Sequence, residues 1–312
     1  MKTILTLLIL MVCHTAVAQE SSLPIIDIHL HAYDIVPQGV PASWAGEPEA
    51  QALTSPANAD QHLQDVLTHM SDLNIVMALT SSTTLSAIQN WKETAPGLFI
   101  GGIQTDEQGN PIVSPDSLRI LKENGDIDVL GELGFQYSGL NPSDPRFDRY
   151  YEVAEESSIP VCLHTGLGPP GGPHSFAPDF RTTLGRPSLF EPVLARHPNL
   201  KVILSHAGWP YITETIALMY IYPDLYADIG VLSWALPTKA FHSALEELMV
   251  AGFGKRIVFG TDQMIWPGAI PIAVQSVREA PFLSEQEKRD ILYNNAARFL
   301  ELDEETIAKH HE

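Results

Sequence analysis

Five short apolar runs of the chain end in residues that can bind a metal ion. The first run carries Asp27-Ile28-His29-Leu30-His31, and the other four end at Glu132, His164, His206 and Asp262. On a β-strand, side chains two residues apart point to the same face, so the two histidines of the first run can reach one ion together. Polar side chains inside an apolar strand are costly unless they are hydrogen-bonded or metal-bound. The five endings together therefore indicate a metal site built from imidazole and carboxylate ligands.

Secondary-structure elements must bring these five polar endings together. The apolar runs that precede them are candidate strands. Eight runs bounded by turn signals are predicted as strands: Pro24–His31, Leu73–Leu79, Leu98–Ile103, Ile127–Leu133, Ile159–His164, Lys201–His206, Leu225–Ile229 and Arg256–Asp262. Most are followed by a stretch with helical spacing. The helical stretches include Asp60–Met70, Asp144–Ser157, Leu189–Arg196, Tyr211–Tyr220, Thr238–Gly252 and Ser284–Leu300.

Strands that alternate with helices indicate an α/β fold, and eight such units predict a closed (β/α)8 TIM barrel. A doubly wound open sheet is the alternative, but it favours a glycine-rich phosphate loop after the first strand, and none follows His31. A barrel places the carboxyl ends of all strands on one rim, where we expect the five endings to converge. Residues 32–59 and 165–181 are too long for plain turns, so we expect both to overhang this rim.

Residues 1–18 are predicted to be a signal peptide, and residues 19–312 a single barrel domain. Lys2 precedes an apolar stretch, and Ala16-Val17-Ala18 fits a small-residue cleavage site. We therefore expect a periplasmic or secreted protein whose mature form does not span a membrane. Cys13 leaves lipid anchoring open, although it matches a lipoprotein cleavage site poorly. After cleavage one cysteine is left, Cys162, which we expect to be a small buried hydrophobe.

The negative charge of the chain limits its partners. There are 38 Asp and Glu residues against 18 Lys and Arg, which gives a formal net charge of −20. Binding to nucleic acid needs clustered basic residues, so no nucleic acid is expected as a partner, and an anionic membrane surface is disfavoured for the same reason. We expect a small-molecule substrate, and the sequence leaves assembly into a homo-oligomer open.

Four short motifs at the polar strand ends resemble the amidohydrolase superfamily, most closely its amidohydrolase-related (type 2) branch. They are Asp27-Ile28-His29-Leu30-His31, His164-Thr165-Gly166, Ser205-His206-Ala207-Gly208 and Gly260-Thr261-Asp262. Residues 294–299, Asn-Asn-Ala-Ala-Arg-Phe, resemble the closing helix of that branch, and Asp144-Pro145-Arg146-Phe147 resembles its segment before the fifth strand. The resemblance implies a metal-dependent (β/α)8 enzyme whose ligands include His29, His31, His164 and Asp262.

Glu132 decides how many metal ions the resemblance implies. It ends the fourth strand, where binuclear members of the superfamily carry a bridging carboxylate. If Glu132 bridges, the other ligands divide into His29, His31 and Asp262 for one ion and His164 and His206 for the second. If the site is mononuclear, His206 is free to act on the water or the substrate. Histidine and carboxylate ligands without thiolates favour zinc, as one or two ions, with manganese as the alternative.

A metal of this kind favours hydrolysis. A bound divalent ion lowers the pKa of its water to about 7 and polarises a carbonyl oxygen. Asp262 would take the proton from the water and return it to the leaving group, and His206 would help to hold the metals or stabilise the oxyanion. The predicted function is a metal-dependent hydrolase that acts on an amide, ester or lactone bond of a small molecule.

Three other functions compete with this one. The same branch includes non-oxidative decarboxylases of aromatic or unsaturated carboxylic acids, which would use His206 with an arginine for the carboxylate, and Arg181 keeps that reading open. A nuclease is disfavoured by the negative charge, and a structural metal is usually closed by four protein ligands, often cysteines. Further candidates for the substrate pocket lie on rim loops or just past strand ends: Arg181, Lys239, Tyr137, Trp209, Trp234 and Trp266.

Overall fold

The computed structural model describes residues 23–312, and its centre is one sheet of eight parallel strands that neighbour each other in chain order. The strands are β1 (Ile25–His31), β2 (Ile75–Ser82), β3 (Phe99–Ile103), β4 (Val129–Leu133), β5 (Val161–Leu163), β6 (Val202–Leu204), β7 (Leu225–Asp228) and β8 (Ile257–Val258). β1 also meets the chain just after β8, because Ile28 N–H donates to the Phe259 carbonyl (2.9 Å) and Asp262 N–H to the His29 carbonyl (2.7 Å). The predicted (β/α)8 TIM barrel is therefore confirmed.

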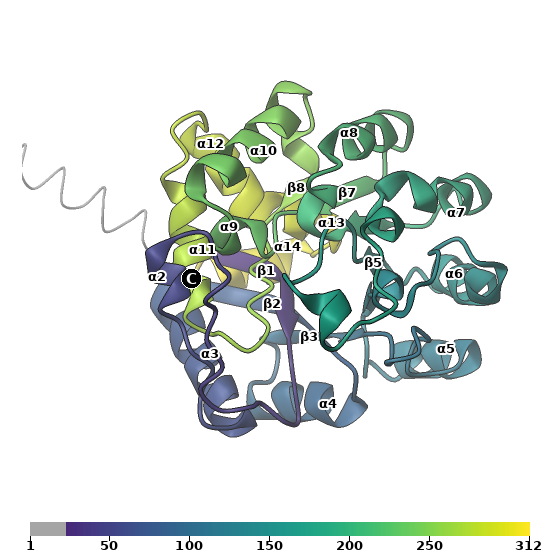
Figure 1. Ribbon diagram of the computed structural model, residues 1–312, viewed down its shortest axis with the longest axis horizontal. Coiled ribbons are helices and arrows are strands. Elements are labelled where there is room, and N and C mark those ends of the chain that lie inside the picture. Colours follow the sequence, from purple (N-terminus) through teal and green to yellow (C-terminus); the bar gives the residue numbers. More distant parts are fainter. Residues whose placement is uncertain (1–22) are drawn as a thin grey trace, which may run out of the picture.

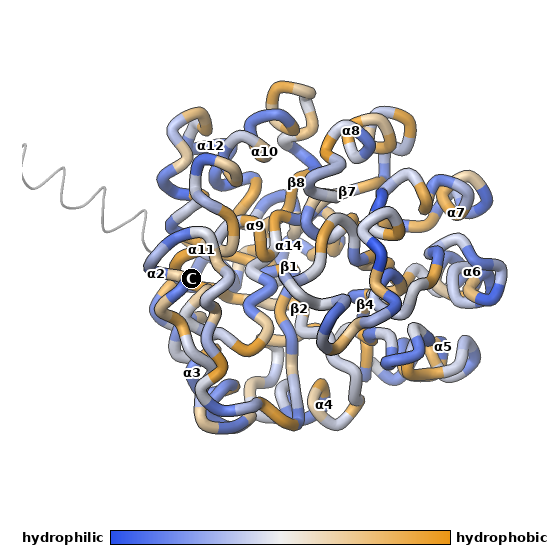
Figure 2. Tube along the Cα trace, viewed as in Figure 1, coloured by the Kyte–Doolittle hydropathy of each residue, from blue (hydrophilic) through white to orange (hydrophobic). Residues whose placement is uncertain are grey.

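Helices surround this barrel (Figure 1). In chain order they are α2 (Pro48–Gln51), α3 (Ala59–Leu73), α4 (Leu85–Thr94), α5 (Pro115–Glu123), α6 (Asp148–Glu156), α7 (Glu191–Arg196), α8 (Ile212–Ile221), α9 (Leu232–Ala235), α10 (Thr238–Val250), α11 (Ala269–Arg278), α12 (Glu285–Arg289), α13 (Asn295–Phe299) and α14 (Glu304–His310). Hydrophobic and hydrophilic residues alternate along the outer helices (Figure 2). This is the pattern of helices that bury one face against a sheet.

Local capping explains where predicted and observed boundaries differ. The Asn58 side chain accepts a hydrogen bond from Gln61 N–H at the start of α3, and α3 ends at Asn74 in the left-handed conformation (φ 56°). Leu73 thus belongs to α3, and the second strand begins at Ile75 instead. The single helix predicted over Ser284–Leu300 is α12, a π-helical turn and α13 in succession.

The core has two parts, one outside and one inside the barrel. The outer cluster packs the outward side chains of the strands against the helices. The inner cluster joins side chains from β1, β2, β4, β5, β6 and β8 to residues of the last helices: Ile26, Ile28, Met77, Leu79, Val129, Cys162, Ile203, Val258, Tyr293, Ala296, Ala297 and Phe299. Cys162 is buried here, as predicted, and burial raises the pKa of its thiol. This inner cluster includes residues of α13. The polar side chains lie at the other end of the barrel, where the strands have their carboxyl ends.

The predictions for residues 1–18, the signal peptide and Cys13, lie outside the residues that the structure describes. Within residues 23–312, the helices are all too short or too polar to cross a membrane.

Candidate metal centre

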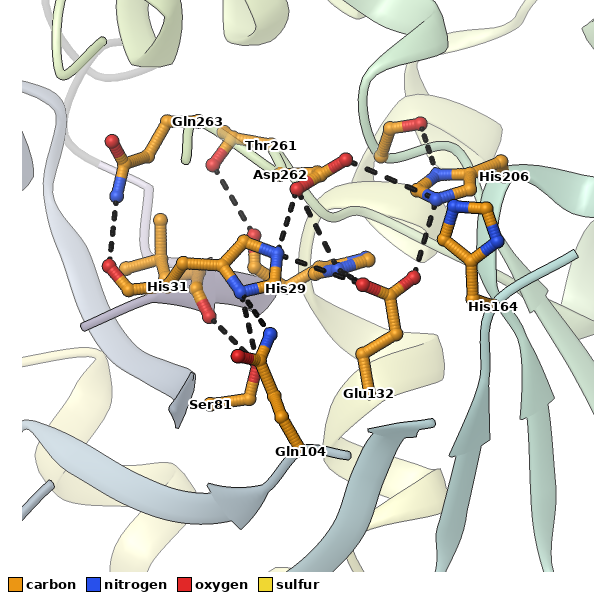
Figure 3. A network of polar contacts seen from close by, with 12 residues as sticks. His29, His31, Ser81, Gln104, Glu132, His164, His206, Thr261, Asp262 and Gln263 are labelled. Carbon is orange, nitrogen blue, oxygen red and sulfur yellow. Dashed lines mark hydrogen bonds and ion pairs between the residues drawn. The ribbon is translucent and has the colours of Figure 1, made fainter. Parts of the chain in front are cut away.

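Four histidines and two carboxylates from five strand ends meet inside the carboxyl end of the barrel (Figure 3). They are His29 and His31 of β1, Glu132 of β4, His164 and His206 just after β5 and β6, and Asp262 beyond β8. Each of these side chains is at most 9% exposed. The structure thus brings together all six residues that the sequence predicts as metal ligands.

The two carboxylate oxygens of Glu132 face different histidines. Oε2 lies 3.3 Å from His29 Nε2 and 3.6 Å from His31 Nε2. Oε1 lies 3.2 Å from His206 Nε2. The carboxylate therefore stands between the two histidines of β1 on one side and His206 on the other, as a carboxylate shared between two ions would.

Asp262, which follows β8, also lies between the two histidines of β1 and His206. Its Oδ1 lies 2.8 Å from His31 Nε2 and 3.7 Å from His29 Nε2, and its Oδ2 lies 3.9 Å from His206 Nε2. Asp262 has a left-handed backbone (φ 47°), and so has His206 (φ 60°). Non-glycine residues adopt this conformation at a cost of about 1–3 kcal/mol, which is typical of side chains held in place for function.

Three of the histidines have the nitrogen away from this centre held by a protein group. Asp228 Oδ2 lies 3.0 Å from His29 Nδ1, and the Gly230 carbonyl lies 3.0 Å from His206 Nδ1. The Tyr137 hydroxyl lies 3.0 Å from His164 Nε2. Such contacts fix the tautomer and the orientation of a ligand ring. They leave Nε2 of His29 and His206, and Nδ1 of His164, free for a metal.

His31 is held from its other side by Ser81 Oγ (3.2 Å) and the Gln104 amide (2.6 Å), both at its Nδ1 (Figure 3). A neutral histidine that binds metal through Nε2 carries its proton on Nδ1, which the Ser81 hydroxyl oxygen can accept. Neither Ser81 nor Gln104 was predicted from the sequence, since each lies on another strand or its end.

The residues fit a divalent cation. Within the centre, four buried atoms lack a hydrogen-bond partner of good geometry: His29 Nε2, Glu132 Oε1, His164 Nδ1 and Asp262 Oδ1. Each such atom costs about 1–3 kcal/mol when it stays unpaired. Ligand atoms within 4.8 Å of one another form three groups: His29, His31 and Glu132; Glu132, His164 and His206; and His29, His206 and Asp228. Imidazole and carboxylate donors of this kind suit zinc or manganese.

The protonation of the centre follows from burial and from its charges. Burial lowers the pKa of His164 to about 4, so this ring is neutral. Burial also acts to lower the pKa of His206, but the hydrogen bond with Glu132 and the charges of both carboxylates prevail and raise it to about 9. Burial opposes ionisation of Glu132, yet His29, His164 and His206 hold its pKa well below the usual range. A metal must therefore compete with a proton at His206.

Asp27, two residues before His29 on β1, makes its hydrogen bonds with backbone and hydroxyl groups. Its Oδ1 accepts hydrogen bonds from the backbone N–H groups of His29 (3.1 Å) and Thr261 (2.9 Å), and its Oδ2 accepts from the Thr261 hydroxyl (2.7 Å). Asp27 thus ties β1 to the segment after β8, while Asp228 orients the His29 ring.

Asp228 is a further residue of the candidate centre that the sequence interpretation missed. It ends β7, is 1% exposed and accepts hydrogen bonds through Oδ1 from the N–H groups of His206 (2.9 Å) and Gly230 (2.7 Å). With Oδ2 engaged by His29, both of its oxygens are used, so Asp228 positions ligands and is not expected to be one. It is the polar residue next to the end of the predicted strand Leu225–Ile229, and that was the available signal.

Replacing Asp228 by asparagine is expected to lower zinc affinity 10–100-fold. An amide that keeps its oxygen on the His206 and Gly230 N–H groups turns its NH2 toward His29 Nδ1, which disfavours the tautomer that binds metal through Nε2. Competition with a chromogenic chelator measures the affinity. Asp128→Asn is the control, because Asp128 accepts from Gly101 N–H and pairs with Lys92 away from the centre. An affinity within threefold of the unmodified protein would contradict the positioning of His29 by Asp228.

A cavity of about 310 Å³ opens onto the centre from the rim. His164, His206, Asp262 and Tyr137 line its polar part. Trp44 of the first long loop and residues 167–170 of the second line it as well, so both loops overhang the rim as predicted.

The predicted pocket residues divide by position. Tyr137 and Trp209 line the cavity. Trp234 and Trp266 lie behind it, with ring centroids 5.4 Å and 5.8 Å from Trp44. The two basic candidates, Arg181 and Lys239, are exposed and line neither this cavity nor its neighbour.

Known proteins resemble this chain in sequence over part of its length and in fold over most of it. Protein fluG of Emericella nidulans is 27% identical over 161 residues, which is 47% of this chain and 18% of that protein. The chain thus spans less than a fifth of that relative.

Solved structures with the same fold include hydrolases and decarboxylases by name. A probable 2-pyrone-4,6-dicarboxylic acid hydrolase from Acinetobacter baumannii has a TM-score of 0.59 at 13% identity, over 90% of this chain and 100% of that one. A 5-carboxyvanillate decarboxylase from Sphingomonas paucimobilis has 0.53 at 18%, over 76% and 82%. A dihydroxybenzoic acid decarboxylase from Polaromonas sp. JS666, solved with manganese, has 0.57 at 13%, over 90% and 97%.

The family comparison covers nearly all of the barrel. The family model described as amidohydrolase matches residues 26–302, from the second residue of β1 to just beyond α13. The convergence of the strand-end motifs on one rim agrees with this match, and the chain therefore belongs to the amidohydrolase family.

Proposed function

We propose that this amidohydrolase-family enzyme hydrolyses an amide, ester or lactone bond of a small molecule with a two-ion centre. The observation that carries the proposal is the position of the Glu132 carboxylate. Its Oε2 faces His29 and His31, while its Oε1 faces His206. His29, His31 and Asp262 would hold one ion and His164 and His206 the other, with Glu132 shared. When bound, the ions would lower the pKa of a water and polarise a carbonyl oxygen.

The chain's own residues would supply the proton transfer and the orientation. Asp262 lies between the two sides of the centre, so its carboxylate can accept a proton from the attacking water and return it to the leaving group. The Tyr137 hydroxyl lines the cavity and contacts His164, so it would keep that ring turned with Nδ1 toward the centre. The buried walls would exclude bulk water from the reacting bond.

Decarboxylation is the second candidate, since structural neighbours carry that name. An arginine for the substrate carboxylate is the feature that would favour it. Arg181 instead donates from Nη1 to the carbonyl oxygens of Pro178 (3.0 Å) and Phe180 (2.7 Å) in its own loop. This engagement favours hydrolysis over decarboxylation.

Metal analysis followed by a substrate panel tests the proposal. We expect the purified protein to bind close to two zinc or manganese ions per chain, to lose activity with a chelator and to regain it with the metal. The panel contains lactones, esters, amides and aromatic carboxylic acids, and turnover is expected for a member of the first three groups. One ion per chain together with release of carbon dioxide from an acid would establish the decarboxylase instead.

A further inference from the structure

The cavity above the metal centre has an uncharged, apolar wall. Trp44 and Trp209 contribute aromatic rings, and Leu167, Val231 and Leu236 contribute aliphatic side chains. Its ionisable groups are Tyr137 and three residues of the centre itself, all at the floor. Any part of a ligand that extends above the floor therefore meets hydrophobic surface.

Trp44 of this wall packs against two further tryptophans, so the wall cannot readily rearrange around a charge. Trp44 packs on Trp234 and Trp266, whose rings are also 6.1 Å apart. The indole N–H groups of these two residues donate to the carbonyl oxygens of Thr261 (2.8 Å) and Val40 (2.8 Å). Because both indoles are fixed by hydrogen bonds, the face that Trp44 presents is held by packing.

The neighbouring cavity, of about 700 Å³, carries acidic and no basic residues. It shares Tyr137 with the first cavity and is lined by Glu132 and, farther out, by Asp106, Glu107 and Asp179. Across the part of the chain that the structure describes, lysine and arginine are missing from the lining of both cavities. A negative group on the ligand would meet apolar surface in one cavity and carboxylates in the other.

Neither cavity is lined by Arg181, Arg186 or Lys239. Arg181 binds carbonyl groups of its own loop. Arg186 pairs with Glu214 and stacks over the Tyr211 ring at 5.3 Å. Lys239 is exposed at the start of α10.

We propose that the substrate is a compact carbonyl compound whose group remote from the reacting bond is apolar and uncharged, and that the cavity rejects a carboxylate at that position. The inference rests on the proposed function, which places the reacting carbonyl at the floor. Burial of an unpaired carboxylate in an apolar wall is strongly unfavourable. The volume, about 310 Å³, lies at the small end of the range for ligand sites and suits one ring or a short alkyl chain.

Two methyl ketones that differ only at the far end test the proposal. 2-Octanone ends in a methyl group, 7-oxooctanoate ends in a carboxylate, and neither contains a hydrolysable bond. We expect calorimetric titration to show at least 30-fold tighter binding of 2-octanone, in metal-free and in zinc-loaded protein. Equal affinities, tighter binding of the acid, or no binding of either ketone would overturn the proposal.

Leu167 provides the matched variants, because it lines the wall from a half-buried loop position where a charge can be accommodated. Leu167→Arg is expected to improve 7-oxooctanoate binding at least tenfold relative to 2-octanone. Leu167→Gln, which adds polarity without charge, should not change that ratio by more than threefold. The same change in both variants would show that charge in the wall does not set the preference.

The two proposals can fail separately. If the ketone preference holds while no ester, lactone or amide is turned over, the hydrolase assignment fails and the apolar wall stands. If esters are hydrolysed and the two ketones bind equally, the substrate class proposed here is wrong and hydrolysis stands. A pair of phenyl esters, phenyl hexanoate and monophenyl adipate, extends the comparison to turnover, with at least a 30-fold higher kcat/KM expected for the hexanoate.

Discussion

Replacement of Asp262 by asparagine is expected to lower kcat/KM by at least a thousandfold. Asparagine keeps the size of the side chain but has a single acceptor oxygen and cannot take a proton at neutral pH. The change thus removes the proton acceptor, and general acid–base catalysis alone contributes about 10²–10⁴-fold. It also weakens a ligand that lies 2.8 Å from His31 Nε2 and 3.9 Å from His206 Nε2. His29→Ala is expected to abolish activity as well, through loss of metal.

Steady-state kinetics on the best substrate of the panel, with metal content measured in the same samples, checks this result. Asp72→Asn is the control, because Asp72 is exposed on α3 and the substitution makes the same chemical change. Turnover within tenfold of the unmodified enzyme in Asp262→Asn or His29→Ala would show that the metal assignment is wrong.

Glu132→Gln is expected to reduce the metal content from close to two ions per chain to close to one, and kcat at least a hundredfold. The carboxylate offers Oε2 to His29 and His31 and Oε1 to His206, whereas an amide offers one oxygen and one NH2 group. The NH2 group cannot bind a cation, so one of the two sides loses its shared ligand.

Elemental analysis of the dialysed variant measures this change. The matched control is Glu155→Gln, since Glu155 also pairs with a histidine, His197 Nδ1, at 3.0 Å, but away from the centre. An unchanged content of two ions in Glu132→Gln would show that Glu132 is not a bridge. A content of one ion in the unmodified protein would show that the site is mononuclear.

The fold could be predicted from the sequence because its signals are local. Strand and helix periodicities extend over a few residues, and their eightfold alternation restricts the topology to very few arrangements. The ends of the elements were less predictable. α3 continues to Leu73 because Asn74 adopts a left-handed cap, and the predicted last strand, Arg256–Asp262, retains regular pairing only over Ile257–Val258.

The six centre residues could also be predicted, because each stands at the end of an apolar run where a barrel must converge. Asp228 stands at such an end too, but an aspartate is common there as a helix cap, and only its contact with His29, 199 residues away, distinguishes it. The candidates for the pocket were the least predictable. Tyr137 and Trp209 line the cavity, whereas Trp234 and Arg181 do not.

The chain's pattern of apolar runs and polar endings, read alone, determines the barrel, the rim and the residue types that meet there, since side-chain alternation along a strand is a property of neighbouring residues. Three features are decided by the tertiary structure: the division of Glu132 between two sides of the centre, the support of His29 by Asp228, and the uncharged wall built from Trp44 and Leu167. These depend on distances of a few ångströms between side chains from separate strands and loops. Only the packed barrel sets those distances.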